Sequence, residues 1–174
     1  MEKFIRFVER VSSGAGYAGG IVLLAIVVLT MLEVVSRYAL KNPLILSDEM
    51  GGYAMVAVSF LGLAYCAAER GHIRITFIME RVSPLAAGWV RLGSLALALA
   101  FIAVAAWVSW KFLGDSFTRD MRSNSMLRTP LKWPQMAIPI GFTLFTLVIL
   151  GQVAQAIQDL RAGRPADKFS AEEF

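Results

Sequence analysis

The stretch YAGGIVLLAIVVLTMLEVVSRY, residues 17–38, decides the fold of this chain. Between Ile21 and Leu32 it carries no charged side chain. A helix rises about 1.5 Å per residue and the hydrocarbon core of a bilayer is about 30 Å thick, so about 20 such residues cross it. A backbone inside lipid must satisfy its own hydrogen bonds, and a helix does so. The run ends in a charged, polar sequence and not at a small-residue cleavage site, so it predicts a retained transmembrane helix and not a signal peptide.

Three further apolar runs follow, at residues 47–68, 85–110 and 134–160. The run at 85–110 is preceded by Ser83-Pro84, a serine N-cap followed by proline at the first helical position. The expected fold class is therefore an all-α integral membrane protein with four transmembrane helices. We expect one transmembrane domain over residues 1–160 and a polar cytoplasmic tail at 161–174.

The composition of the whole chain agrees with lipid as its main solvent. Of the 174 residues, 57% are hydrophobic and 17% are charged, and the mean hydropathy is +0.61. Soluble domains are about 45–50% apolar and about 25% charged. The net charge of +4 comes from basic residues that flank the apolar runs, which favours binding to anionic lipid headgroups over nucleic acid. The single cysteine, Cys66, and the single histidine, His72, exclude an internal disulfide and a histidine-based metal site.

Two short amphipathic segments are predicted to lie in the membrane interface. In residues 2–13 the apolar side chains Phe4, Phe7, Val8 and Val11 share one helical face, with basic residues beside it. In residues 72–82 apolar side chains recur at the same helical spacing. The fold class thus adds short interfacial helices to the four spans.

Basic residues near the span ends predict the orientation. With the N-terminus in the cytoplasm, ten basic residues lie inside and seven outside, which favours cytoplasmic termini. The exception is the loop at residues 111–132, whose five basic and two acidic residues give a net charge of +3 on the outside. Such a loop either steers an acidic partner, through Arg119, Arg122 and Arg128, or anchors in headgroups through Lys111 and Lys132.

No catalytic constellation or phosphate-binding loop occurs in the chain, and Glu33 is the only acidic residue that lies within an apolar run and not at one of its ends. Glu33 stands four residues before Arg37, the spacing and order of a helical ion pair. The pair is either structural or a contact to a partner helix. Residues four apart of which at least one is small, such as Gly62 with Cys66, Ala64 with Ala68 and Gly93 with Leu97, are typical of close packing between membrane helices.

Two polar segments border the second run. Before it, Ser47 or Asp48 is expected to cap the helix while Asp48 and Glu49 complement its dipole, or else the segment docks a partner subunit. After it, Gly71 stops the helix, and His72 and Arg74 follow, either as headgroup anchors or as a partner contact.

Several sequence blocks occur in an order and spacing that are specific in combination. They are EVVSRY (33–38), PL (43–44), SDE (47–49), FLGLAY (60–65), HIRI (72–75), TPLKW (129–133) and PIG (139–141). Over nearly the whole chain this pattern resembles the small permease subunit of tripartite ATP-independent periplasmic (TRAP) transporters. Leu46 and Thr76 depart from the pattern, where the family often has tryptophan and an acidic residue.

The resemblance implies a subunit that scaffolds a large permease subunit in the inner membrane. A periplasmic solute-binding protein would deliver an organic acid anion, and an ion gradient would drive uptake. The implied partners are these two proteins and membrane lipids, with no cofactor beyond bound lipid. Two rivals remain: a small membrane-embedded enzyme of the four-helix kind, which needs polar groups converging in the spans, and a small dimeric exporter, which needs a carboxylate deep in its first span.

Overall fold

The computed structural model describes residues 2–42, 46–69, 84–125 and 127–162. Within these ranges every regular element is a helix: α1 (Glu2–Ala39), α2 (Leu46–Ala68), α4 (Pro84–Thr118), α5 (Lys132–Gln135) and α6 (Ala137–Arg161). Four helical segments in this part of the chain are long and apolar enough to cross a membrane, as predicted. The segment predicted as an interfacial helix at 72–82 and the tail from residue 163 onward lie outside the described residues.

Two of the helices, α1 and α4, are longer than the apolar runs that predicted them. Residues 2–13, expected as a separate interfacial helix, continue into the first span as one helix of 38 residues. Helix α4 runs on to Thr118 and not to Trp110, because residues 111–118 contain no proline and the helix accommodates their one glycine, Gly114. The fourth run is interrupted at Met136, between α5 and α6, and Pro139 stands in the first turn of α6, where its missing N–H removes no hydrogen bond of that helix.

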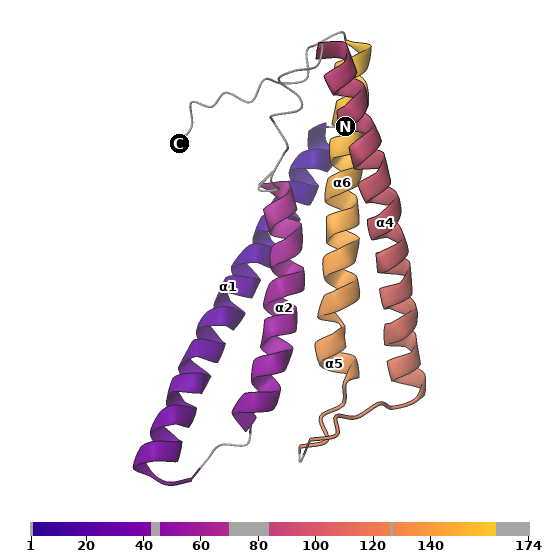
Figure 1. Cartoon of the computed structure of the whole chain (residues 1–174). Coiled ribbons are helices and arrows are strands. Elements are labelled where there is room, and N and C mark those ends of the chain that lie inside the picture. The colour runs from indigo at the N-terminus through magenta and orange to yellow at the C-terminus, as the bar shows by residue number, and fades with distance from the viewer. Residues whose placement is uncertain (1, 43–45, 70–83, 126, 163–174) are drawn as a thin grey trace.

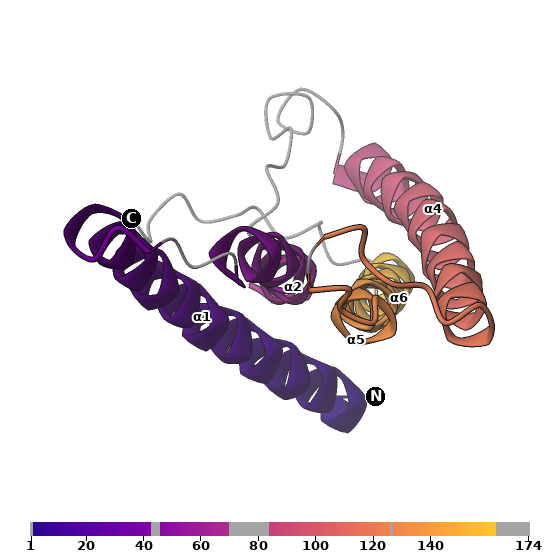
Figure 2. The same ribbon diagram turned by 90° about the horizontal axis from the view of Figure 1, so that it is seen from below.

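The four long helices stand side by side in one row and do not form a closed bundle. Successive long helices of the chain run in opposite directions (Figure 1), and the view along them shows the order α1, α2, α6, α4 (Figure 2), so the neighbours α2 and α6 run parallel. Helix α2 packs against both α1 and α6, and α4 packs against α6. The last helix of the chain is therefore inserted between the second and third spans.

Helix α1 slants across this row. On its long apolar stretch, the more buried positions recur every three or four residues and so face α2 along one seam. These positions are Val22, Ile26, Leu29, Glu33 and Ser36. The other end of α1 reaches α6 as well. There the side chain of Val8 is buried among the small residues of α2 and the apolar residues of α6; the buried cluster is Val8, Ala64, Ala67, Ile102, Phe145, Val148 and Ile149.

Three glycines permit the closest approaches between neighbouring helices. At Gly88 of α4, an added Cβ would lie 2.6 Å from the Leu160 side chain of α6. A Cβ added at Gly141 of α6 would lie 2.7 Å from the carbonyl carbon of Phe60 on α2. A Cβ at Gly16 of α1 would lie 2.6 Å from the ring of Tyr65. By contrast, a Cβ at Gly62 or Gly93 would meet nothing within 4 Å. The small-residue spacing had pointed to Gly62 and Gly93 as close contacts, and that prediction was wrong.

The single row leaves much apolar surface uncovered. Large apolar side chains on the two outer helices are mostly exposed, for example Ile21, Leu24 and Val28 on α1 and Leu97 and Phe101 on α4. Exposed apolar surface of this extent is stable only against lipid or another membrane protein. The architecture is thus that of a membrane protein with two broad faces and no enclosed centre.

Candidate functional site

A hairpin of residues 119–131, which connects α4 to α5, lies at one end of the helix row (Figure 1). Its two arms are joined by the hydrogen bonds from the Ser123 N–H to the Thr129 carbonyl (3.0 Å) and from the Leu131 N–H to the Met121 carbonyl (3.0 Å). Where the hairpin joins the helices, the buried Ser116 hydroxyl on α4 donates to the Gln135 side-chain oxygen on α5. These bonds give the loop a defined shape. We call residues 119–131 the hairpin.

Aromatic and basic residues on α4 indicate where the membrane surface lies below the hairpin. The Lys111 Nζ lies 4.0 Å from the centre of the Trp107 ring, and the Trp110 Nε1–H donates to the Thr143 hydroxyl (3.0 Å). Tryptophan and lysine at a span end mark the interface. Arg91 lies twenty residues earlier on the same helix, about 30 Å away at 1.5 Å per residue, which matches the hydrocarbon thickness. Residues 112–118 therefore raise the hairpin about 10 Å above that surface.

The basic residues of the hairpin differ in their partners. Asp120 accepts hydrogen bonds from the Arg122 Nη2 (3.0 Å) and Nε (3.3 Å), and the Lys132 Nζ lies 3.4 Å from its other oxygen. The hydrogen bonds and charge of Arg122, followed by those of Lys132, lower the pKa of the Asp120 carboxyl below its ordinary value. Arg119 and Arg128 are exposed, and no carboxylate of the described residues pairs with them. The accessible positive charge is thus concentrated on Arg119 and Arg128.

The predicted Glu33–Arg37 ion pair is present on α1 at the same end of the row. The Arg37 Nη2 lies 2.6 Å and its Nε 3.0 Å from one oxygen of Glu33. The side chain of Glu33 is 7% exposed and that of Arg37 is 51% exposed, so the carboxylate lies inside the α1–α2 seam and the guanidinium reaches outward. Asp48 on α2 is close enough to add electrostatic attraction for Arg37. The geometry supports the structural interpretation of the pair, and its role in contacting a partner stays a prediction.

The start of α2 departs from the expected capping pattern. Because α2 begins at Leu46, Ser47 and Asp48 lie inside its first turn and not at the N-cap, and the buried Ser47 hydroxyl has no hydrogen-bond partner among the described residues. Asp48 and Glu49 do occupy the first turn, where negative charge complements the helix dipole.

Glu49 has a further connection that the sequence did not indicate. Its Oε1 accepts a hydrogen bond from the Tyr53 hydroxyl one turn later on α2 (2.6 Å). Its Oε2 accepts a hydrogen bond from the Ser125 hydroxyl in the hairpin, 76 positions along the chain. No local pattern signals a contact of that separation, so Ser125 could not be found from the sequence. Tyr53 was missed as well, although it stands four residues after Glu49 and that helical spacing could have indicated the contact.

A wide groove of about 620 Å³ separates the start of α2 from the hairpin. It brings together Asp48, Glu49 and Arg122 from the predicted site residues, but not Arg119 or Arg128. The predicted residues His72 and Arg74 lie outside the described part of the chain. The remaining groove residues are small or polar except for Leu131: Gly52, Tyr53, Ser123, Asn124, Ser125 and Leu131.

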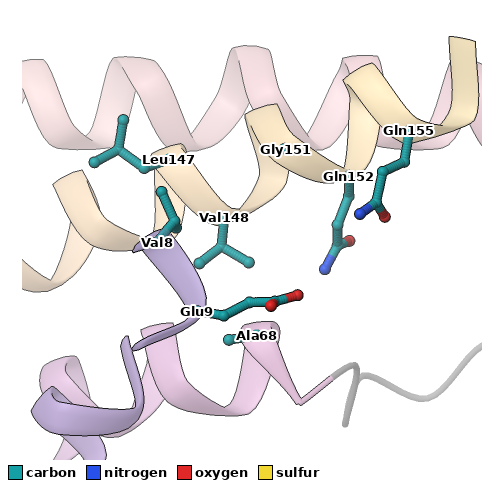
Figure 3. Close-up of a pocket in the computed structure, with 8 residues that line it drawn as sticks. All are labelled: Val8, Glu9, Ala68, Leu147, Val148, Gly151, Gln152 and Gln155. Atoms are coloured by element: carbon teal, nitrogen blue, oxygen red, sulfur yellow. The ribbon is translucent and has the colours of Figure 1, made fainter. Parts of the chain in front are cut away.

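The opposite end of the row offers only a small cavity. Where α1 crosses α6, Glu9 and Gln152 point toward one another across a space of about 20 Å³ (Figure 3). The Gln152 Nε2–H donates to the Ala67 carbonyl (2.9 Å), which joins α6 to α2. This space has room for a single water molecule and not for a transported solute.

The polar groups in the spans do not converge on one centre. Glu33 pairs with Arg37 on α1, whereas Arg91 on α4 lies 3.8 Å from Asp159 on α6, at the other end of the row. A membrane-embedded enzyme of the four-helix kind would need these groups together. The arrangement within the described residues therefore does not favour that rival function.

Comparison with known proteins identifies the family. No match was found among curated protein sequences. A family model does match residues 26–159, more than three quarters of the chain, from the seam of α1 through the hairpin to the end of α6. Its description is the DctQ component of tripartite ATP-independent periplasmic transporters, a transporter component and not an enzyme family. With four membrane-crossing helices and this match, the chain belongs to the DctQ family and is the small membrane subunit of a TRAP transporter.

Proposed function

We propose that this chain scaffolds the large permease subunit of its transporter and helps to dock the periplasmic solute-binding protein through the hairpin. Membership of the family implies a tripartite complex in the inner membrane, with a large permease and a binding protein. In this complex an ion gradient drives uptake of an organic acid anion. The single row of helices supports the scaffolding role, because its uncovered apolar faces suit a second membrane protein.

The observation that carries the docking role is the position and charge of the hairpin. It stands about 10 Å above the tryptophan belt of α4, held out by a helix that continues beyond the lipid. Its exposed Arg119 and Arg128 have no acidic partner in the described chain. Uncompensated basic groups attract an acidic protein surface and raise its association rate, most strongly at low salt. Headgroup anchoring, by contrast, requires basic groups at the belt itself, where Lys111 stands.

The test is a charge reversal that leaves the hairpin intact. The double variant Arg119→Glu and Arg128→Glu should slow uptake by the reconstituted complex when binding protein is limiting. The rate should recover as binding protein is added, and the dependence of uptake on salt should weaken. A matched control reverses Lys111, which lies at the belt, to glutamate. Unchanged uptake by the double variant at limiting binding protein, with normal assembly of the subunits, would remove the docking role.

The scaffolding role has a separate test. We expect the chain to copurify with the large permease subunit and to show no uptake when reconstituted alone, since its spans hold no free carboxylate site for an ion or substrate in the described residues. Uptake by vesicles that contain only this chain would overturn the scaffolding proposal.

The proposed orientation places both termini in the cytoplasm and the hairpin in the periplasm. The ten-to-seven distribution of basic residues supports it. The alternating helices support the same side for the two ends, because α1 begins and α6 ends at the same end of the row (Figure 1). In this proposal no cofactor takes part, and bound lipid covers the apolar surface that the permease leaves free.

A further inference from the structure

The hairpin contains backbone conformations that it would not adopt without support. Arg128 has a φ of 46° and Asp120 a φ of 43°, both in the left-handed region that side chains with a Cβ disfavour. Arg128 is directly linked to the turn by the hydrogen bond from its N–H to the Ser125 carbonyl (3.2 Å). The direction of the Arg128 side chain therefore depends on where Ser125 is held.

Ser125 is held from outside the hairpin by Glu49. The two carboxylate oxygens of Glu49 serve different elements, one accepting the Tyr53 hydroxyl within α2 and the other the Ser125 hydroxyl. The bond to Tyr53 fixes the rotamer of Glu49, so its second oxygen is presented to the hairpin at a defined position. A carboxylate acceptor makes a stronger hydrogen bond than a neutral one.

We propose that Glu49 is a positioning residue for docking: it fixes the hairpin on the start of α2 so that Arg128 is presented in one orientation to the binding protein. This inference rests on the proposed docking function and adds to it a residue that does not touch the partner. Glu49 lines the groove. Its effect on the binding protein passes through Ser125 and the turn that ends at Arg128.

The experiment compares hairpin mobility with docking in the complex of this chain and its large permease. Glu49→Ala and Ser125→Ala each remove the bond, and Glu49→Gln keeps the shape with a neutral acceptor. Glu69→Ala is the matched control, since Glu69 is exposed at the far end of α2. Trypsin cleavage after Arg128 reports local opening of the hairpin. The binding-protein concentration for half-maximal uptake reports docking, and the rate at saturation reports transport.

Loss of a hydrogen bond to a charged group should raise the rate of cleavage after Arg128 on the order of tenfold in Glu49→Ala and Ser125→Ala. The half-maximal concentration of binding protein should rise severalfold while the saturated rate stays unchanged. Glu49→Gln should lie between the wild type and Glu49→Ala, and the double variant of Glu49 and Ser125 should be no worse than either single one. Glu69→Ala should match the wild type in every measurement.

Two results would overturn the inference. One is unchanged cleavage in Glu49→Ala, which would show that the bond does not hold the hairpin. The other is faster cleavage with an unchanged half-maximal concentration, while the reversal of Arg119 and Arg128 does raise that concentration. In the second case docking by the arginines stands and only the role of Glu49 is lost. Failure of the arginine reversal itself would instead remove the docking function.

Discussion

Replacing Gly141 with alanine should push α2 and α6 apart and destabilise the fold. The new Cβ would lie 2.7 Å from the carbonyl carbon of Phe60 and 2.8 Å from its Cβ, closer than real Cβ atoms come to other heavy atoms. The carbonyl belongs to the backbone of α2, so no change of rotamer relieves the contact. Gly141 is buried in the middle of the row, and the two helices must separate by several tenths of an ångström or more to admit the methyl group.

The magnitude follows from two opposing effects. Overpacking a well-packed interior costs about 1–3 kcal/mol. Alanine is better than glycine inside a helix by up to about 1 kcal/mol, which offsets part of that cost. We therefore expect Gly141→Ala to lower the free energy of unfolding by about 1–2 kcal/mol. At Gly93, where a Cβ meets nothing within 4 Å, the same substitution should be neutral or stabilising by up to about 1 kcal/mol.

The assay is unfolding of the purified chain in mixed micelles with increasing SDS, followed by tryptophan fluorescence and circular dichroism. Gly93→Ala and Gly62→Ala are the matched controls, since both sites are open. Adding Phe60→Leu to Gly141→Ala should not restore stability, because the carbonyl group remains in place. If Gly141→Ala unfolds at the same SDS fraction as Gly93→Ala, the close approach of α2 and α6 does not exist as described.

Three further predictions concern the charged groups and the orientation. Arg37→Met should destabilise the chain more than Glu33→Gln in the same SDS assay, because it leaves the buried carboxylate without its guanidinium, and the double variant should recover most of the loss. Arg122 and Lys132 lower the pKa of Asp120, so the stability it contributes is present above its ordinary pKa of 3.8 and is lost as the pH falls through the lowered value. Hydrogen exchange of residues 119–131, corrected for its intrinsic pH dependence, should therefore stay constant between about pH 5 and 8 and rise only below about pH 4; in Asp120→Asn it should be faster throughout, without that acid step. A periplasmic reporter fused to the C-terminus should be inactive and one inserted in the hairpin active, and the reverse pattern would contradict the orientation.

Local sequence was enough for the presence of the four spans and for the Glu33–Arg37 contact within one of them. Residues 17–38 predicted a span because a backbone in lipid has no partner other than itself, so composition alone selects the helix. The Glu33–Arg37 pair was predictable because residues four apart on a helix are neighbours whatever the rest of the chain does. Helix length was less predictable: α4 continues past Trp110, through Gly114 to Thr118, although the apolar run ends at Trp110 and no proline follows it in residues 111–118.

Contacts between segments depended on the tertiary structure. The spacing of small residues pointed to Gly62 and Gly93, whereas the close approach is at Gly141, because the shape of the facing helix decides which glycine is needed. The sequence also showed a loop with a net charge of +3, but not which of its basic side chains lack an acidic partner. In the described residues Asp120 pairs with Arg122 and Lys132, and no carboxylate pairs with Arg119 or Arg128.

By itself, the sequence determined that this chain has four membrane-crossing helices and belongs with the small TRAP subunits, since both depend on the order of residues along the chain. Only the tertiary structure decided that α6 stands between α2 and α4. The same is true of the bond from Ser125 to Glu49, which joins residues 76 positions apart. Hydrophobic burial in lipid selects which segments are helices but is nearly the same for every order of those helices. The order in which the helices stand side by side is therefore decided by the shapes of their packing surfaces and by a few hydrogen bonds between residues far apart in the sequence.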